Sequence, residues 1–177
     1  MPSSDGGKSR PMVEPQVRPA TAADAPEVAR IWEAAWRDAH IGHVPDELVA
    51  ARTPESFRTR AAERVPDTAV AQVDGEVAGF VMVLDDEVDQ VFVDRRHRGS
   101  GVAGLLLAEA ERLVGVAGHP RAWLAVVTGN ARARRFYERQ GWVDDGAFDH
   151  AAPVGDRTIP VSCHRYVKDV AADRPGP

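Results

Sequence analysis

The hydrophobic pattern of this sequence changes its period along the chain. Apolar residues recur at helical spacing after Pro26, a favoured first residue of a helix; they are Val28, Ile31, Trp32 and Ala35. Shorter apolar runs further on are typical of strands. The elements expected up to residue 93 are a strand at 17–18, this helix, a turn with one or two short helices within 40–64, and strands at 69–73, 77–84 and 87–93.

Beyond residue 93 the pattern alternates helices and strands. The elements expected there are a glycine-rich loop at 99–104, a helix at 102–114, a strand at 122–128, a helix at 131–140 that Gly141 ends, a loop, and a closing strand at 161–167. The earlier strands form a meander, joined first by the tight turn that Asp74-Gly75 favours. A meander followed by strand, helix, strand and helix predicts an α+β fold, a mixed sheet with helices packed on it.

Length and composition indicate one domain between two tails. A chain of 177 residues with 44% hydrophobic content is long and apolar enough to build one core. Residues 1–16 and 171–177 are rich in Ser, Gly or Pro and are expected to be flexible tails around a domain at 17–170. Lys8 and Arg10 precede no apolar run, so no signal peptide is expected, and no stretch approaches a membrane span. These features predict a cytoplasmic protein without a membrane partner.

The charge balance narrows the choice of partners. A net charge of −5 argues against a nucleic-acid-binding face and weakly favours a cationic or amine-bearing partner. Cys163 is the only cysteine, which excludes an intramolecular disulfide and a multi-cysteine metal site.

Candidate chemistry begins at the glycine-rich loop, where a strand enters and a helix leaves. The first amides of a helix lack intrahelical partners, so such a turn can bind an anion, and Arg98 adds a cation at its edge. No Gly-Lys-Ser/Thr follows, which excludes a Walker loop, and a Rossmann fingerprint would need a third glycine and an early strand–helix–strand unit. The alternative is a glycine-rich turn with solvated arginines, and the loop alone leaves both interpretations open.

A second motif runs from Asn130 to Trp142. Ala133, Phe136 and Tyr137, with Gln140, share one helical face, while the arginines of this helix face solvent; these are Arg132, Arg135 and Arg139. Phe136 is expected to pack in the core. Tyr137 is either a core tyrosine with a satisfied hydroxyl or a phenolic proton donor, and Asn130 is suited to capping the helix.

Together the two motifs resemble those of the GNAT N-acetyltransferase superfamily. Arg98, Gly101 and Ala103 match its pyrophosphate loop, although Arg95 stands where relatives usually have a proline, and the second motif matches its Asn…Ala…Phe-Tyr…Gly-Phe/Trp segment. The resemblance runs from the Asp-Gly hairpin to Trp142 and is weakest at 40–64 and after Trp142. It implies the GNAT fold, a central, mostly antiparallel, splayed sheet of about six or seven strands flanked by about four helices.

The resemblance also implies acetyl-CoA as the cosubstrate and no metal. In the family, the pantetheine arm pairs with the strand before the loop, here the backbone of Val91 and Val93, and the residue at the position of Asn130 hydrogen-bonds the cofactor arm. For Tyr137, donation of a proton to the leaving CoA thiolate is the favoured role, because expulsion of a thiolate requires a proton. The residues expected to bind the cofactor are Val91, Phe92, Val93, Arg98, Gly99, Ser100, Gly101, Val102, Ala103, Gly104, Asn130, Ala133 and Tyr137.

The base that takes the proton of the amine has several candidates. Glu87 matches a position where related sequences often carry a glutamate, and strand alternation predicts that it shares a face with Asp89, Val91 and Val93; Asp89 is a further candidate base. It is either a base, acting directly or through water, or an exposed strand-end carboxylate. His40 is another candidate, because imidazole titrates near neutrality, and a surface-turn histidine is its alternative.

The acceptor site is expected between the first helices and the loop before the last strand. The candidates are Trp32, Trp36, His40, His43 and residues near His150. The function expected is N-acetylation of a primary amine, on a small molecule or a protein, by direct attack in a ternary complex. A non-catalytic acyl-CoA-binding module and a transferase that uses another acyl-CoA are the alternatives. A homodimer remains open, and a bacterial cytoplasm is the expected setting.

Overall fold

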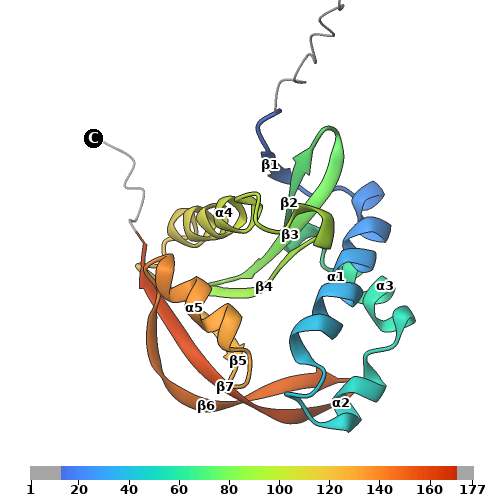
Figure 1. The fold of residues 1–177 in the computed structure, drawn as a ribbon, viewed down its shortest axis with the longest axis vertical. Coiled ribbons are helices and arrows are strands. Elements are labelled where there is room, and N and C mark those ends of the chain that lie inside the picture. Colours follow the sequence, from blue (N-terminus) through green and yellow to red (C-terminus); the bar gives the residue numbers. More distant parts are fainter. Residues whose placement is uncertain (1–12, 171–177) are drawn as a thin grey trace, which may run out of the picture.

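A seven-stranded sheet organises the part of the chain that the computed structural model describes, residues 13–170 (Figure 1). The strands are β1 (Gln16–Pro19), β2 (Thr68–Val73), β3 (Glu76–Leu84), β4 (Glu87–Val93), β5 (Arg121–Val127), β6 (Val143–Val154) and β7 (Arg157–Asp169). Their order in the sheet is β1-β2-β3-β4-β5-β7-β6, and all neighbours are antiparallel except β4 and β5. The predicted α+β class and mixed, mostly antiparallel sheet are confirmed. The predicted tails lie mainly outside the described residues.

Five α-helices accompany the strands within residues 13–170, about as many as predicted. They are α1 (Ala25–His40), α2 (Asp46–Ala51), α3 (Pro54–Glu63), α4 (Val102–Val116) and α5 (Ala131–Arg139). Pro26 and Pro54 lie in the first turns of α1 and α3, where a missing amide hydrogen costs nothing. The turn between β2 and β3 has positive φ at Asp74 (52°) and Gly75 (81°), as an Asp-Gly hairpin requires.

The sheet separates two apolar cores. On one side α1, α2 and α3 cover it with residues such as Trp32, Leu48 and Phe57. On the other side α4 and α5 pack through residues such as Leu106 and Phe136 (Figure 1). We refer to the side of α4 and α5 as the cofactor side and to the side of α1–α3 as the acceptor side.

β4 and β5 diverge soon after they meet. Their register contains one pair, Glu87 opposite Trp123, and the Trp123 amide donates to the Asp86 carbonyl at 3.0 Å. The neighbouring strand pairs run in register over most of their length. The sheet is therefore splayed between β4 and β5, as the resemblance implied.

A bulge in β4 changes which side chains share a face. Val88 pairs with Val83 and Gln90 pairs with Met82, so Asp89 has no partner on β3. Val88 consequently packs in the cofactor-side core, to which Val91 also belongs. The predicted face of Glu87, Asp89, Val91 and Val93 is therefore wrong, because the extra residue breaks the strict alternation on which it relied.

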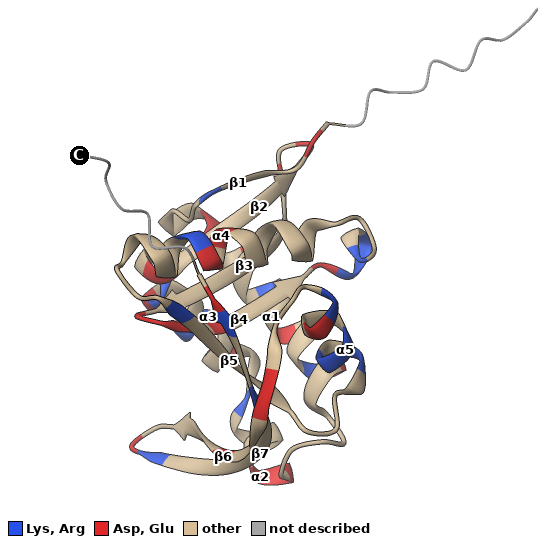
Figure 2. Cartoon of the chain, turned by 90° about the vertical axis from the view of Figure 1, so that its left-hand side faces the viewer, with Lys and Arg blue, Asp and Glu red and all other residues tan. Residues whose placement is uncertain are grey.

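The C-terminal hairpin is longer than the sequence pattern predicts. A loop was expected before a strand at 161–167, but the structure forms β6 and extends β7 over Arg157–Asp169. Most of β6 is exposed, and it carries Gly146 and Pro153, so its sequence lacks apolar alternation. Backbone pairing with β7 maintains this edge strand. Figure 2 shows the hairpin extending at the end of the sheet, with acidic and basic residues interspersed along the described chain.

Candidate active site

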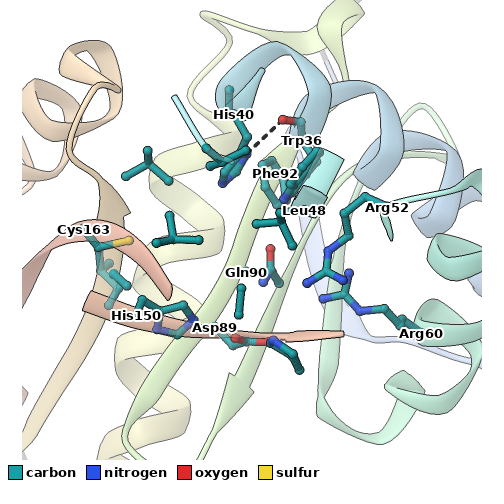
Figure 3. Close-up of a pocket in the computed structure, with 18 of the residues that line it drawn as sticks. Trp36, His40, Leu48, Arg52, Arg60, Asp89, Gln90, Phe92, His150 and Cys163 are labelled. Atoms are coloured by element: carbon teal, nitrogen blue, oxygen red, sulfur yellow. Dashed lines mark hydrogen bonds between the residues drawn. The ribbon is translucent and has the colours of Figure 1, made fainter. Parts of the chain in front are cut away.

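A cavity of about 860 Å³ opens where β4 and β5 diverge (Figure 3). From the cofactor side it is lined by Asn130, Ala133 and Tyr137, and from the acceptor side by Trp36 and His40. Segments of α1, α3, β4, β5 and β6 complete its wall. The cavity therefore connects the two sides of the sheet, which is the arrangement needed to bring two ligands together from opposite directions.

The structure brings only part of the predicted site to this cavity. The predicted residues that line it are Trp36, His40, Glu87, Val91, Phe92, Asn130, Ala133 and Tyr137, joined by the alternative base Asp89 and by His150. Trp32 lies elsewhere: it is 0% exposed and packs against Phe57 and Phe80 in the core. His43 is exposed and lies against the β5–α5 turn, so close that a Cβ on Gly129 would come 2.2 Å from its Nδ1 atom.

The glycine-rich loop lies outside the cavity wall, as does Val93. Gly99 and Gly101 have φ of +77° and +85°, with open space where a Cβ would be. Gly101 is the N-cap of α4, and no side chain caps the helix, so the amides of its first turn have no capping partner within the described residues. Arg98 is held 2.9 Å from Asp38 of α1. This geometry suits an oxyanion at the start of α4.

Within this loop, the side chains of the first helical turn are small or turned inward. Val102 is 0% exposed and packs in the cofactor-side core, so only its backbone can meet a ligand. Gly104 has one neighbour within ordinary contact, the Gln140 side chain at 3.7 Å from a hypothetical Cβ. The predicted loop residues can therefore recognise a ligand mainly through main-chain groups.

Tyr137 is fixed by three aromatic neighbours. Its ring centroid lies 5.2 Å from that of Phe136, 6.3 Å from Trp142 and 6.2 Å from Tyr166. Within residues 13–170 its hydroxyl makes no hydrogen bond, and the residue lines the cavity. Burial raises the pKa of Tyr137 to about 12, so the phenol keeps its proton at neutral pH. Asn130 caps α5 by accepting from the Ala133 amide at 3.1 Å.

Glu87 has an environment that favours its neutral form. Burial raises the pKa of this carboxyl to about 7, and the negative charges of Asp89 and Asp86 act in the same direction. Asp89 itself is paired with Arg64 at 3.0 Å. Glu87 can consequently exchange a proton close to neutral pH, where an ordinary glutamate would be fully ionised.

His40 is the last residue of α1 and lines the cavity, so its interpretation as a surface-turn residue is wrong. Its ring stacks on Trp36 with centroids 4.7 Å apart. The Nδ1 atom lies 2.9 Å from the Trp36 carbonyl oxygen, and a carbonyl only accepts, so Nδ1 carries the hydrogen. Burial lowers the pKa of His40 to about 4. The imidazole is therefore neutral at physiological pH.

Sequence reasoning missed a basic wall on the acceptor side. Arg52, Arg60 and Arg64 line the cavity, as do Asp89 and His150. Figure 3 shows Arg52 and Arg60 on the same wall. The available sequence signal was weak: Arg60 and Arg64 each follow a buried residue of the α3 pattern by three positions. That spacing places the arginines beside the core face of the helix, but it does not show which cavity they border.

Comparisons with known proteins agree with this fold. A family model described as the acetyltransferase (GNAT) family matches residues 26–142, so the chain belongs to this family. It is 30% identical over 81 residues to an uncharacterized N-acetyltransferase of Mycobacterium tuberculosis, an alignment covering 43% of this chain and 52% of the relative. An uncharacterized N-acetyltransferase of Mycobacterium bovis matches equally well. The chain thus spans about half the length of the curated relatives it matches.

Solved structures share the fold at low sequence identity. A GCN5-related N-acetyltransferase of Rhodopseudomonas palustris has a TM-score of 0.70 at 21% identity, covering 90% of this chain and 98% of that one. The PaiA N-acetyltransferase of Thermoplasma acidophilum, solved in complex with coenzyme A, has a TM-score of 0.69 at 15% identity, covering 89% and 99%. YncA of Salmonella typhimurium, solved with its cofactor acetyl-CoA, has a TM-score of 0.65 at 17% identity, covering 93% and 98%.

The described residues show neither a metal-binding cluster nor a membrane-spanning helix. Between residues 13 and 170, no group of three or more His, Cys, Asp or Glu side chains is placed to hold a metal ion. In the same part of the chain, no helix has the length and apolar character needed to cross a membrane.

Proposed function

We propose that the protein is an N-acetyltransferase that moves an acetyl group from acetyl-CoA to a primary amine in a ternary complex. The observation that carries this proposal is the cavity through the splayed sheet. Tyr137 reaches it from the cofactor side, and Glu87 borders it from β4. A thioester and an amine entering from opposite sides would meet between a proton donor and a proton acceptor.

The chain offers a fitting site for the nucleotide end of acetyl-CoA. The uncapped start of α4 presents main-chain amides and the positive end of a helix dipole, which suit a pyrophosphate. The open space at Gly99 and Gly101 leaves room for close approach. From there the acyl arm would follow the edge of β4 past Val93 and Val91, where splaying leaves main-chain groups without strand partners on β5.

Acetyl-CoA supplies a thioester whose carbonyl carbon the amine nitrogen attacks; the new C–N bond replaces the C–S bond. The neutral amine gives up one proton, and we assign its acceptance to Glu87, directly or through water. The departing thiolate gains one proton, and we assign its donation to the Tyr137 hydroxyl. Solvent then returns the proton to Tyr137 and removes it from Glu87, so protons and charges balance.

Glu87 suits the role of base better than His40. A base is most effective when its pKa lies near the working pH. The pKa of Glu87 is raised to about 7, whereas that of His40 is lowered to about 4. His40 is neutral and packed on Trp36, and its position fits contact with the acceptor rather than proton removal.

The first experiment is a calorimetric titration of the protein with acetyl-CoA and with CoA, followed by an assay of thiol release with a panel of amines. We expect micromolar binding of both and amine-dependent release of CoA. Failure to bind at millimolar concentration would reject the proposal. Binding without turnover of any amine would favour a non-catalytic acyl-CoA-binding module. Faster reaction with succinyl-CoA or a longer acyl-CoA than with acetyl-CoA would identify that acyl-CoA as the donor.

A further inference from the structure

We propose that the acceptor is a primary amine that also carries an oxyanion, a carboxylate or a phosphate, bound by Arg52 and Arg60 on the acceptor side of the cavity. The identity of this ligand as an acetyl acceptor rests on the function proposed above. The anion site itself rests on the geometry of two arginines whose guanidinium groups form no ion pair or hydrogen bond with a carboxylate within residues 13–170.

Arg52 is the more confined of the two. It follows α2 and is 6% exposed, yet it lines the cavity. Within residues 13–170 its guanidinium makes no hydrogen bond or ion pair. Its backbone is fixed, because its carbonyl accepts from Arg37 Nη2 at 3.3 Å. No guanidinium nitrogen of Arg52 is among the fully buried unpartnered atoms of residues 13–170, so the group keeps contact with the cavity. A mostly buried residue whose charged group meets only the cavity is placed to bind an anion there.

Arg60 lies beside Arg52, and its guanidinium also lacks a hydrogen-bonded or ion-paired partner within residues 13–170. Its guanidinium carbon lies 4.3 Å from the centroid of the Trp32 ring, which fixes its direction. Its Nη1 atom is buried and has no hydrogen-bond partner in the described chain. Figure 3 shows the guanidinium groups of Arg52 and Arg60 adjacent to each other at the cavity. Burial, followed by the charge of Arg52, lowers the pKa of Arg60 to about 10.

The nearby carboxylates act on this pair only without direct contact: burial lowers the pKa of both arginines, the charge of Asp89 acts to raise both, and that of Glu63 acts to raise the pKa of Arg60. Asp89 is engaged by Arg64 at 3.0 Å, and Arg64 also contacts Asp67 at 2.9 Å. Glu63 is exposed at the end of α3 and makes no ion pair within residues 13–170. Each guanidinium is a fork of N–H donors that can bind a carboxylate or a phosphate through two parallel hydrogen bonds.

The pair is distinct from the candidate pyrophosphate site. Arg52 and Arg60 belong to the segment of α2 and α3, whose Leu48 and Phe57 pack in the acceptor-side core. The start of α4 packs in the opposite core through Val102. Since the sheet lies between them, the arginine pair is free to bind the acceptor while acetyl-CoA occupies the other side.

This local charge reverses the expectation drawn from the whole chain. The net charge of −5 favoured a cationic acceptor. The cavity instead combines a cationic pair with Glu87, which is poised to take a proton from an amine. A molecule with an oxyanion at one end and an amino group at the other complements both.

The test compares matched acceptors in the thiol-release assay at saturating acetyl-CoA. Amino acids are paired with the amines that lack only the carboxylate, and aminoalkyl phosphates with the corresponding amino alcohols. We expect kcat/KM to favour the anionic member of at least one pair by about 100-fold. The ratio of kcat/KM between the anionic acceptor and its matched amine is compared for the two series. The series with the larger ratio shows whether the site prefers a carboxylate or a phosphate. Equal or better use of the neutral or cationic amines would overturn the proposal.

Variants connect the preference to the two arginines. Arg52→Met and Arg60→Met should each raise the acceptor KM by about 10-fold or more and reduce the preference, with the Kd for acetyl-CoA unchanged. Arg58→Met is the matched control, because Arg58 lies on the same helix but is exposed and paired with Glu55. It should behave as wild type. Unchanged discrimination in both cavity variants would contradict the assignment.

A binding measurement keeps the inference independent of turnover. CoA-saturated protein is heated with and without inorganic phosphate, so that the pyrophosphate site is already filled. We expect phosphate to raise the Tm of the wild type and of Arg58→Met but not of Arg52→Met, whose own Tm should equal or exceed that of the wild type. The same phosphate effect in all three, or none in the wild type, would overturn the anion site. Absent CoA binding would instead reject the proposed function.

Discussion

The two sides of the sheet differ in the groups that they offer to a ligand. On the cofactor side, Gly99, Gly101 and the uncapped start of α4 present main chain and open space. On the acceptor side, the cavity wall consists of aromatic and charged side chains, among them Trp36 and Arg52. Main-chain groups can bind any pyrophosphate in the same way, whereas side chains define a particular acceptor.

The two regions also differ in how they are assembled. The loop and the first turn of α4 are contiguous in the sequence, so their geometry follows from local glycine placement. The acceptor side draws on the end of α1, the α2–α3 segment, the bulge of β4 and the edge strand β6. Substitutions should therefore separate the two regions, each altering one ligand while leaving the other unaffected.

Gly101→Glu should have the largest effect and should be confined to the cofactor side. A carboxylate at the start of α4 would repel pyrophosphate, and we expect acetyl-CoA affinity to fall at least about 100-fold. Calorimetry measures this loss. Gly101→Ala shares the backbone strain of a residue at φ +85° without the charge, so it is the control. Affinity lost equally in both variants would attribute the effect to strain.

Tyr137→Phe should affect the chemical step at the junction of the two sides. It removes the proton donor but preserves the ring contacts, so we expect kcat to fall by about 100- to 1,000-fold. The Kd for acetyl-CoA should stay within about twofold, because the hydroxyl is assigned to the transition state. Stopped-flow or steady-state thiol release measures kcat. Parallel losses of kcat and of affinity would show that the tyrosine acts by packing.

Glu87→Gln should have a smaller effect, about 10- to 100-fold on kcat/KM, because water can partly replace a base. The pKa of Glu87 is raised to about 7, so the fraction of the carboxylate form, which accepts a proton, increases as the pH rises through that value. The wild-type rate should therefore rise as the pH increases through 7. The variant should lack this inflection. A pH profile that is identical in both proteins would exclude Glu87 as the base.

Trp32→Phe should have the smallest kinetic effect, because phenylalanine keeps an aromatic ring against the Arg60 guanidinium; sequence reasoning placed Trp32 in the acceptor pocket. Trp32 is 0% exposed, so we expect a loss of about 1–3 kcal/mol in the free energy of unfolding. Denaturant unfolding measures that loss. Trp36→Phe is the counterpart: Trp36 lines the cavity and stacks on His40, so this change should raise the acceptor KM. A larger increase of the acceptor KM in Trp32→Phe than in Trp36→Phe would show that Trp32 contributes to the acceptor site.

Sequence reasoning was least accurate about which acceptor-side residues line the cavity. His43 and Trp32 were grouped with Trp36 and His40 because they are neighbours in sequence, yet only the latter two line the cavity. Arg52 and Arg60 were overlooked, since arginines in a polar segment with prolines resemble solvated residues. The bulge at Asp89 also escaped the alternation rule, because a single extra residue leaves no pattern in one strand alone.

The sequence by itself determined the family, the α+β class, most element boundaries up to residue 142 and the form of the glycine-rich loop, because each depends on local periodicity, turn residues or a contiguous motif. The tertiary structure decided the length of the β6–β7 hairpin, the raised pKa of Glu87 and the exposure of the arginine pair to the cavity. These properties arise from strand pairing and from burial among segments distant in sequence, and such contacts exist only once the chain has folded.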